Sequence, residues 1–128
     1  MKSLKSYIQE KLIIKNNKSI NYKYFPKTKD ELKNIILKRI KDEGNEVDLN
    51  DIDVSNITDM SYLFEKIDFN GDISRWDVSN VIDMNCMFGE CTHFNGDISR
   101  WDVLNVKNTK NMFKKSPLQN NLPKWYKK

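Results

Sequence analysis

The sequence predicts an α/β repeat fold: a short solenoid with one short strand and one helix per repeat, preceded by an α-helical N-terminal cap. Three observations predict it. A block of about 24 residues recurs along the chain, an apolar stripe at helical spacing follows the centre of each block, and a separate amphipathic segment precedes the first block. Because a unit this small cannot bury its own apolar face, successive repeats must stack on one another.

The repeat is visible in two sets of aligned positions. One position is held in turn by Ile52, Trp76, Trp101 and Trp125, at steps of 24, 25 and 24 residues. The segments that superimpose are Leu49–Ile57, Ile73–Val81 and Ile98–Val106, with a fourth beginning at Leu122, and further along Met60–Phe64, Met84–Phe88 and Thr109–Phe113. This many matching positions exclude a chance similarity. Residues 45–128 therefore contain three repeats and a truncated fourth.

Each repeat is predicted to contain a helix. In the second repeat, apolar residues fall at helical spacing over about three turns; they are Val81, Met84, Met87, Phe88 and Cys91. Asn80 and Asp83 form a pair typical of a helix start. We therefore expect helices near 57–66, 81–90 and 106–115. Brief strands are expected near Ile73 and Ile98, after the Asn-Gly turns.

Residues 1–44 are expected to form a helical cap on the open edge of the first repeat. Thr28 and Glu31 form a capping box, which predicts a helix that stops at Gly44. Its apolar residues are Leu32, Ile35, Ile36 and Ile40, and an earlier amphipathic helix is expected at Leu4, Ile8 and Leu12. The chain is thus predicted to be one structural unit, with a cap over 1–44 and repeats over 45–128.

Charge is segregated along the chain. Residues 1–44 hold 12 Lys or Arg against 5 Asp or Glu, residues 45–105 hold 3 against 13, and residues 106–128 hold 7 against none. Both ends are therefore basic and the middle is strongly acidic. A nucleic-acid-binding domain usually carries a uniform basic stripe, which this pattern does not provide.

The recurring motif is Asp-Ile-Ser-x-Trp-Asp-Val-Ser-Asn-Val-x-Asp-Met-x-x-Met-Phe, over about residues 47–125. With this motif the chain resembles the BspA-like leucine-rich repeats, and in particular the class of about 25 residues found in mycoplasma-type and other bacterial surface proteins. The resemblance implies a leucine-rich-repeat-like solenoid that binds proteins or ligands without catalysis. The last repeat departs from the motif, with Leu104 in place of Ser79 and Thr109 in place of Met84.

Aspartates recur at fixed positions of the repeat, which brings like charges close together when the repeats stack. Three interpretations are open: carboxylates that cap turns, a calcium-binding ladder, or an acidic recognition face. The recognition face would consist of Asp72, Arg75, Asp77, Asp97, Arg100 and Asp102. Turn capping is the interpretation we favour for the carboxylates themselves, and no Asp-x-Asp-x-Asp-Gly calcium loop is present.

The tryptophans at one repeat position are interpreted as core residues. Ile52 occupies the same position in the first repeat, which indicates that the position requires an apolar side chain. An exposed ladder of Trp76 and Trp101 used for binding is the alternative. Phe88 is expected in the core of the middle repeat, so that Phe88→Ala should cost about 3–5 kcal/mol.

The residue sets needed for catalysis are missing from the sequence. Cys86 and Cys91 lack Cys-x-x-Cys spacing, and His93 is the single histidine and is expected to face solvent. The sequence has no glycine-rich phosphate loop. We therefore expect no enzymatic activity, no metal and no cofactor. Two cysteines are too few for a disulfide framework, and neither a signal peptide nor an apolar span is evident, which favours a cytoplasmic protein without membrane contact.

The function predicted from these features is a non-catalytic protein–protein interaction module that binds a partner with a basic surface. A narrower hypothesis is a small inhibitor encoded by a phage or mobile element (an antidefence protein) that binds a host protein through its acidic solenoid face. The alternatives are a nucleic-acid-binding protein that uses the basic ends, or a surface-type ligand-binding repeat protein. The sequence leaves the partner and the oligomeric state open.

Overall fold

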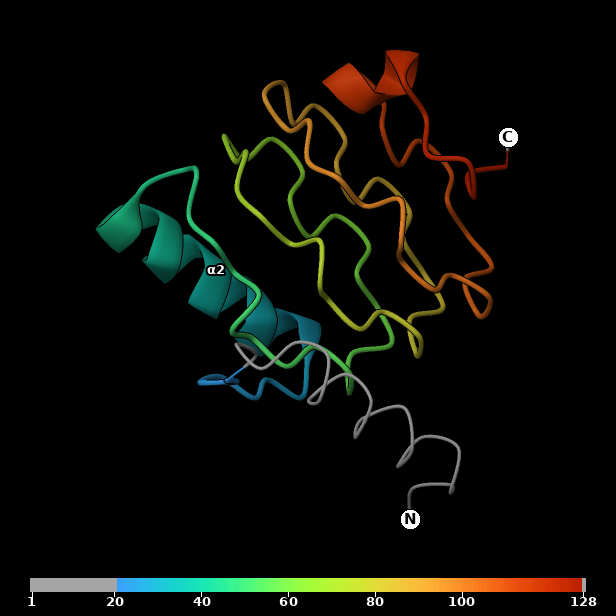
Figure 1. Ribbon diagram of the computed structural model, residues 1–128. Helices are drawn as coiled ribbons and strands as arrows, with labels where there is room; N and C mark the ends of the chain where they lie inside the picture. The colour runs from blue at the N-terminus through green and yellow to red at the C-terminus, as the bar shows by residue number, and fades with distance from the viewer. Residues whose placement is uncertain (1–20, 128) are drawn as a thin grey trace.

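The structure is a computed structural model that describes residues 21–127. Its regular elements are the helix α2, Lys29–Glu43, and the short 3-10 helix η1, Pro117–Asn120. Between them the chain runs as three stacked coils, with α2 across one end of the stack and η1 at the other (Figure 1). The earlier helix expected at Leu4, Ile8 and Leu12 lies outside the described residues.

Each coil has two limbs that run side by side and are joined by turns at either end (Figure 1). We call residues 48–54, 72–78 and 97–103 the first limbs, and residues 59–66, 83–90 and 108–115 the second limbs. Parallel bridges join equivalent residues of neighbouring coils: Asp48 with Asp72, Asp59 with Asp83, and Asp83 with Asn108. The coils therefore stack in register with the sequence repeat.

The three helices predicted near 57–66, 81–90 and 106–115 are wrong. These segments are the second limbs, and each is a chain of tight turns with two non-glycine residues at positive φ: Tyr62 and Lys66, Cys86 and Glu90, Asn111 and Lys115. Alternate N–H groups donate to the next coil instead of to the preceding turn of a helix. Those of Met60, Tyr62, Phe64 and Lys66 reach the carbonyls of Asp83, Asn85, Met87 and Gly89 at 2.9–3.0 Å.

The predicted fold class is wrong for the same reason. Within residues 21–127, α2 is the only α-helix, and no strand forms near Ile73 or Ile98. The isolated bridge of Asp72 lies next to Ile73, and no bridge in this range lies near Ile98. An α/β solenoid of the leucine-rich-repeat type needs a strand and a helix in every repeat. This chain instead closes each coil with turns, because its backbone hydrogen bonds are divided between short local turns and the neighbouring coil.

Helix α2 forms where the capping box predicts it. The Thr28 hydroxyl accepts a hydrogen bond from the Glu31 N–H at 3.1 Å, and the Glu31 carboxylate accepts one from the Lys27 N–H at 2.9 Å. The helix ends at Gly44, whose φ of 97° is unfavourable for other residues. Leu32 and Ile36 are fully buried and belong to the core of the stack. A boundary between cap and repeats at residue 44 stays a prediction.

Stacked aromatic rings form the core. Phe64, Phe88 and Phe113 follow one another through the three coils, with ring centroids 5.4 and 5.8 Å apart. Trp76 and Trp101 are buried and stack at 6.4 Å. The prediction that the tryptophans are core residues is therefore confirmed for these two, and the exposed-ladder alternative is wrong. Each indole N–H donates to a carbonyl of the preceding coil, at Leu49 and Ile73, so the burial leaves no unpaired donor.

Gly71 is required by close packing between coils. A Cβ atom at this position would lie 1.9 Å from the Val47 carbonyl oxygen and 2.6 Å from the Phe69 ring. At Gly96, the equivalent position in the next repeat, the closest contact is the Phe94 ring at 2.7 Å. The glycine therefore allows each phenylalanine to fold inward over the turn that follows it.

Candidate functional site

The six residues predicted as a recognition face lie together on the first limbs of the second and third coils. All six are exposed: Asp72, Arg75, Asp77, Asp97, Arg100 and Asp102. Equivalent residues follow the repeat from one coil to the next, where backbones stack about 4.8 Å apart. We call the four carboxylates Asp72, Asp77, Asp97 and Asp102 the aspartate ladder.

Every carboxylate of the aspartate ladder caps its own turn. The Oδ1 atom of Asp72 accepts hydrogen bonds from the Ser74 N–H at 2.9 Å and the Ser74 hydroxyl at 2.7 Å. Asp77 and Asp97 bind Ser79 and Ser99 in the same way. Asp102 accepts the Leu104 N–H at 3.1 Å, where leucine replaces the serine. The turn-capping interpretation is therefore confirmed, and these bonds fix the carboxylates in place.

These hydrogen bonds also favour the charged form. At Asp97, the bonds from the Ser99 hydroxyl and N–H lower the pKa of the carboxyl below its ordinary value, and Arg100 adds to the effect. At Asp72, burial raises the pKa, but the bonds from Ser74 and Asn50 and the charge of Arg75 outweigh it and the pKa is lowered. Both groups are therefore anionic at neutral pH.

The two arginines project from the same limbs because their neighbours are buried. Arg75 precedes Trp76 and Arg100 precedes Trp101, and both tryptophans point into the core. The backbone N–H of Arg75 donates to the Asn50 side chain of the preceding coil at 2.8 Å. The face thus presents guanidinium groups between rows of carboxylates, an arrangement that can set the register of a charged partner.

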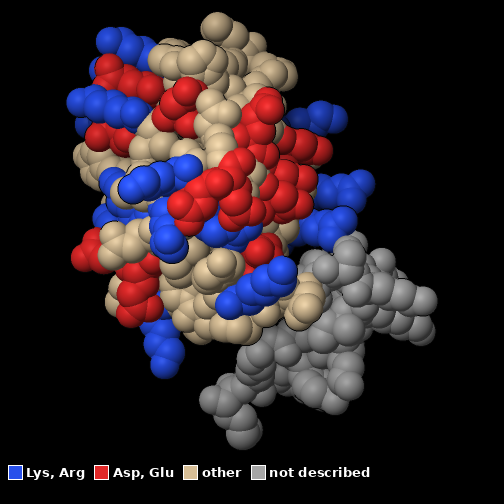
Figure 2. Space-filling model, turned by 90° about the vertical axis from the view of Figure 1, so that its left-hand side faces the viewer, with Lys and Arg blue, Asp and Glu red and all other residues tan. Residues whose placement is uncertain are grey.

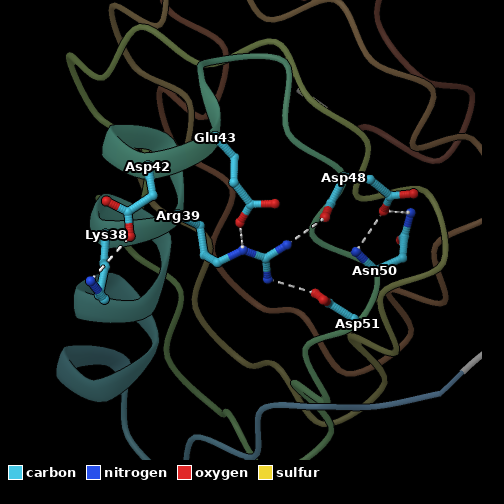
Figure 3. Close-up of polar contacts among 7 residues, drawn as sticks. All are labelled: Lys38, Arg39, Asp42, Glu43, Asp48, Asn50 and Asp51. Atoms are coloured by element: carbon cyan, nitrogen blue, oxygen red, sulfur yellow. Dashed lines mark hydrogen bonds and ion pairs between the residues drawn. The ribbon is translucent and has the colours of Figure 1, made fainter.

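Toward α2, the Asp51 carboxylate of the first coil is ion-paired within the chain. Figure 3 shows Arg39 reaching from α2 to the first coil, where it donates to Asp51 at 2.8 Å and to the Asp48 carbonyl at 3.3 Å. It also pairs with Glu43 on its own helix. Burial lowers the pKa of the Arg39 guanidinium, but the hydrogen bonds to Asp51 and Glu43 outweigh this effect and the pKa is raised. Sequence reasoning missed these contacts of Arg39, because nothing in the spacing of residues 39 and 51 indicates that they meet.

The chain matches one protein-family model, described as "Mycoplasma protein of unknown function, DUF285", over residues 31–128. The chain belongs to this family. The match confirms a likeness to mycoplasma-type repeat proteins, but it assigns no leucine-rich-repeat class. No curated protein and no solved structure matches the chain.

For this DUF285 member, acidic and basic side chains are also segregated on the surface. Figure 2 shows a contiguous band of Asp and Glu side chains across one face, with Lys and Arg side chains on either side of it. The acidic residues come mainly from positions 45–105, which hold 13 Asp or Glu. On the left-hand side of the same view, basic and acidic side chains alternate.

The other residues considered for chemistry, Cys91 and His93, each contact another residue of the chain. Cys91 is buried, its thiol lies 3.1 Å from the Ile67 carbonyl, and burial raises its pKa to about 11, which suppresses thiolate formation. His93 is exposed as expected, and its Nδ1 atom lies 2.9 Å from Asp68, a pairing that the sequence did not reveal. Across residues 21–127, no three His, Cys, Asp or Glu side chains gather as a metal site.

A shallow groove crosses the turns that join first to second limbs. Asn80 and Asn105 line it, and their side-chain amides donate to the Ser55 and Ser79 carbonyls at 2.7 Å. These asparagines therefore link the turns of neighbouring coils.

Neither helix in the described part of the chain has the length and apolar composition needed to cross a bilayer.

Proposed function

We propose that this protein is a non-catalytic protein-binding module whose aspartate ladder, with Arg75 and Arg100, contacts a partner with a basic surface. The observation that carries the proposal is that four exposed carboxylates are held in register on two stacked coils, each by hydrogen bonds within its own turn. A partner that binds these groups need not order them first.

Preorganisation favours binding because ordering side chains at an interface costs about 0.5–1.5 kcal/mol for each flexible group. The repeat spacing adds selectivity, since cations on the partner must match carboxylates one coil apart. Arg75 and Arg100 would repel cations in the wrong register. The proposal includes a cytoplasmic location, which the free thiols of Cys86 and Cys91 favour.

The test replaces all four ladder aspartates by asparagine. Asparagine keeps the turn cap, because Asn108 stands at the position of Asp59 and Asp83 and its Oδ1 accepts the Lys110 N–H at 3.0 Å. The charge is removed while the fold is kept. Binding to a partner recovered from cell lysate, and to a Lys/Arg-rich peptide as probe, is measured with purified components by fluorescence anisotropy at low and high salt.

The matched control removes four charges from the second limbs, with Asp59→Asn, Glu65→Gln, Asp83→Asn and Glu90→Gln. We expect the ladder variant to bind about tenfold more weakly or worse, and the control to bind as the unmodified protein does. Equal losses in both variants would mean that only net charge matters. Full retention of binding by the ladder variant would refute the proposal.

The narrower hypothesis of a phage- or mobile-element-encoded inhibitor rests on the acidic middle of the chain. It requires the partner to be a basic nucleic-acid-binding protein, and it requires DNA or RNA to compete with this chain for that partner. A competition measurement with a short duplex separates this inhibitor from a general binding module. Simultaneous binding of the duplex and this chain would exclude it.

A further inference from the structure

In the part of the chain that the structure describes, the second limb of the third coil ends the stack with a row of backbone N–H groups that make no hydrogen bond. In the first two coils the corresponding N–H groups donate to the coil that follows; in the second coil, those of Met84, Cys86 and Phe88 reach Asn108, Lys110 and Met112 at 2.8–2.9 Å. Their equivalents in the third coil are Thr109, Asn111 and Phe113. Within residues 21–127, none of these three N–H groups donates a hydrogen bond.

The rest of this end is closed by the chain itself. Leu122 to Tyr126 begin a fourth coil, whose Trp125 indole donates to the Ile98 carbonyl at 2.8 Å. Its Tyr126 hydroxyl donates to the Thr109 carbonyl of the second limb at 3.3 Å, which leaves those three N–H groups unbonded. Beyond the donor row, the Gln119 side chain of η1 accepts the Lys115 N–H at 2.8 Å. The open edge is therefore bounded on both sides, and its three donors lie at alternate residues.

The surroundings of this edge are cationic. Lys107, Lys110 and Lys114 are exposed on or beside the second limb, and residues 106–128 contain seven Lys and no Asp or Glu. An occupant therefore needs carbonyl acceptors at two-residue spacing together with negative side chains. A peptide backbone supplies the first requirement and Asp or Glu side chains supply the second.

We propose that the edge formed by Thr109, Asn111 and Phe113 binds an acidic peptide segment of a partner protein, which adds to the stack as a further limb. Backbone carbonyls of the segment accept the three N–H groups, and its carboxylates pair with Lys110 and Lys114. A second copy of the chain fits less well, because α2 covers the opposite end of the stack and both terminal segments are strongly basic. Nucleic acid would satisfy the lysines but not the spaced row of amides.

The test uses the full chain and a short synthetic peptide of alternating Glu and Thr as probe, with the matching Lys-Thr peptide as control. Amide hydrogen exchange is followed at Thr109, Asn111 and Phe113 with and without the peptide. We expect these amides to exchange about tenfold more slowly in the complex, while surface amides of α2 are unaffected. Binding without protection of these amides, or equal binding of the Lys-Thr peptide, would overturn the proposal.

A pair of variants separates this edge from net charge. Lys110→Glu with Lys114→Glu should weaken Glu-Thr binding about tenfold, whereas Lys27→Glu with Lys41→Glu, near α2, should leave it unchanged. A single-stranded oligonucleotide is titrated in parallel. If it binds more tightly than the peptide and depends on the same lysines, the edge is a nucleic-acid site and the peptide assignment is wrong. Protection that rises with protein concentration alone would indicate a second copy instead.

Discussion

The two ends of the stack are built from the same repeat but are closed in different ways. At the N-terminal end, α2 lies across the first coil, buries Leu32 and Ile36, and is held by the Arg39 contacts to Asp48 and Asp51. At the C-terminal end, a partial fourth coil lies beside the first limb and reaches the second limb through Tyr126, whose ring lies 5.3 Å from that of Phe113. Trp125 has the same position and the same indole bond as Trp101, yet it is only partly buried. Burial of a repeat residue is therefore set by its neighbours as much as by its own identity.

The largest expected effect is in the middle of the stack. Phe88 has no exposed surface and stacks on Phe64, Phe94 and Phe113 at 5.4, 4.4 and 5.8 Å. Phe88→Ala should lower the free energy of unfolding by about 3–5 kcal/mol, measured by urea denaturation. Phe113→Ala, at the end of the same stack, should cost less because no coil follows it. Equal losses would mean that the C-terminal end of the stack is packed as completely as the middle.

The next largest effect is the difference in stability loss between variants of α2 and of η1, the helices at the two ends of the stack. Ile36→Ala removes a fully buried side chain from α2 and should cost about 2–5 kcal/mol, whereas Leu118→Ala in η1 should cost less because its site is slightly exposed. Amide hydrogen exchange then shows which coil each substitution destabilises. We expect faster exchange in the first coil for Ile36→Ala and in the third coil for Leu118→Ala. Uniform acceleration in both variants would show that the stack unfolds as one cooperative unit.

A smaller difference is expected between two equivalent glycines. Gly71→Ala places a Cβ atom against the Val47 backbone, which cannot turn away, and should cost about 1–3 kcal/mol. Gly96→Ala meets chiefly the edge of the Phe94 ring, which can shift, so its cost should be lower. Thermal unfolding of the two variants measures this difference. A greater loss for Gly96→Ala would contradict the packing argument.

The smallest effect is the contribution of Asp59, near the N-terminal end, to the pH dependence of stability. Burial raises the pKa of Asp59, but hydrogen bonds from Ser61 and the ion pair with Lys29 of α2 at 3.2 Å outweigh it and lower the pKa. Because the folded-state pKa is depressed, this stabilisation is complete above the unfolded pKa of about 3.9 and is lost as pH falls through the lower folded value. Asn108 holds the same position in the third coil and does not titrate.

Asp59→Asn should therefore flatten the loss of stability between about pH 4 and pH 2, measured by denaturation at a series of pH values. Asp30→Asn, an exposed change on α2, serves as the control. An unchanged pH profile for Asp59→Asn would show that neither the hydrogen bonds from Ser61 nor the ion pair with Lys29 stabilises the charged carboxylate in solution.

Sequence reasoning located the repeat, the buried positions and the turn-capping aspartates. It misjudged the backbone that connects them. Val81, Met84, Met87, Phe88 and Cys91 fit a helical stripe, and all five are buried. A chain of tight turns with Cys86 and Glu90 at positive φ points the same residues inward, so the apolar spacing alone does not distinguish the two conformations. Neither the ion pair between Arg39 and Asp51 nor the contact between His93 and Asp68 left a sequence signal.

The sequence by itself determined which residues face the core and which cap turns, because these properties depend on side-chain chemistry repeated at fixed intervals. It also determined α2, whose capping box at Thr28 and Glu31 acts within a few residues. Only the tertiary structure decided whether the second limbs are helices or turns. Their alternate N–H groups find acceptors about 24 residues away in the next coil, and a bond to a distant segment cannot be inferred from local pattern.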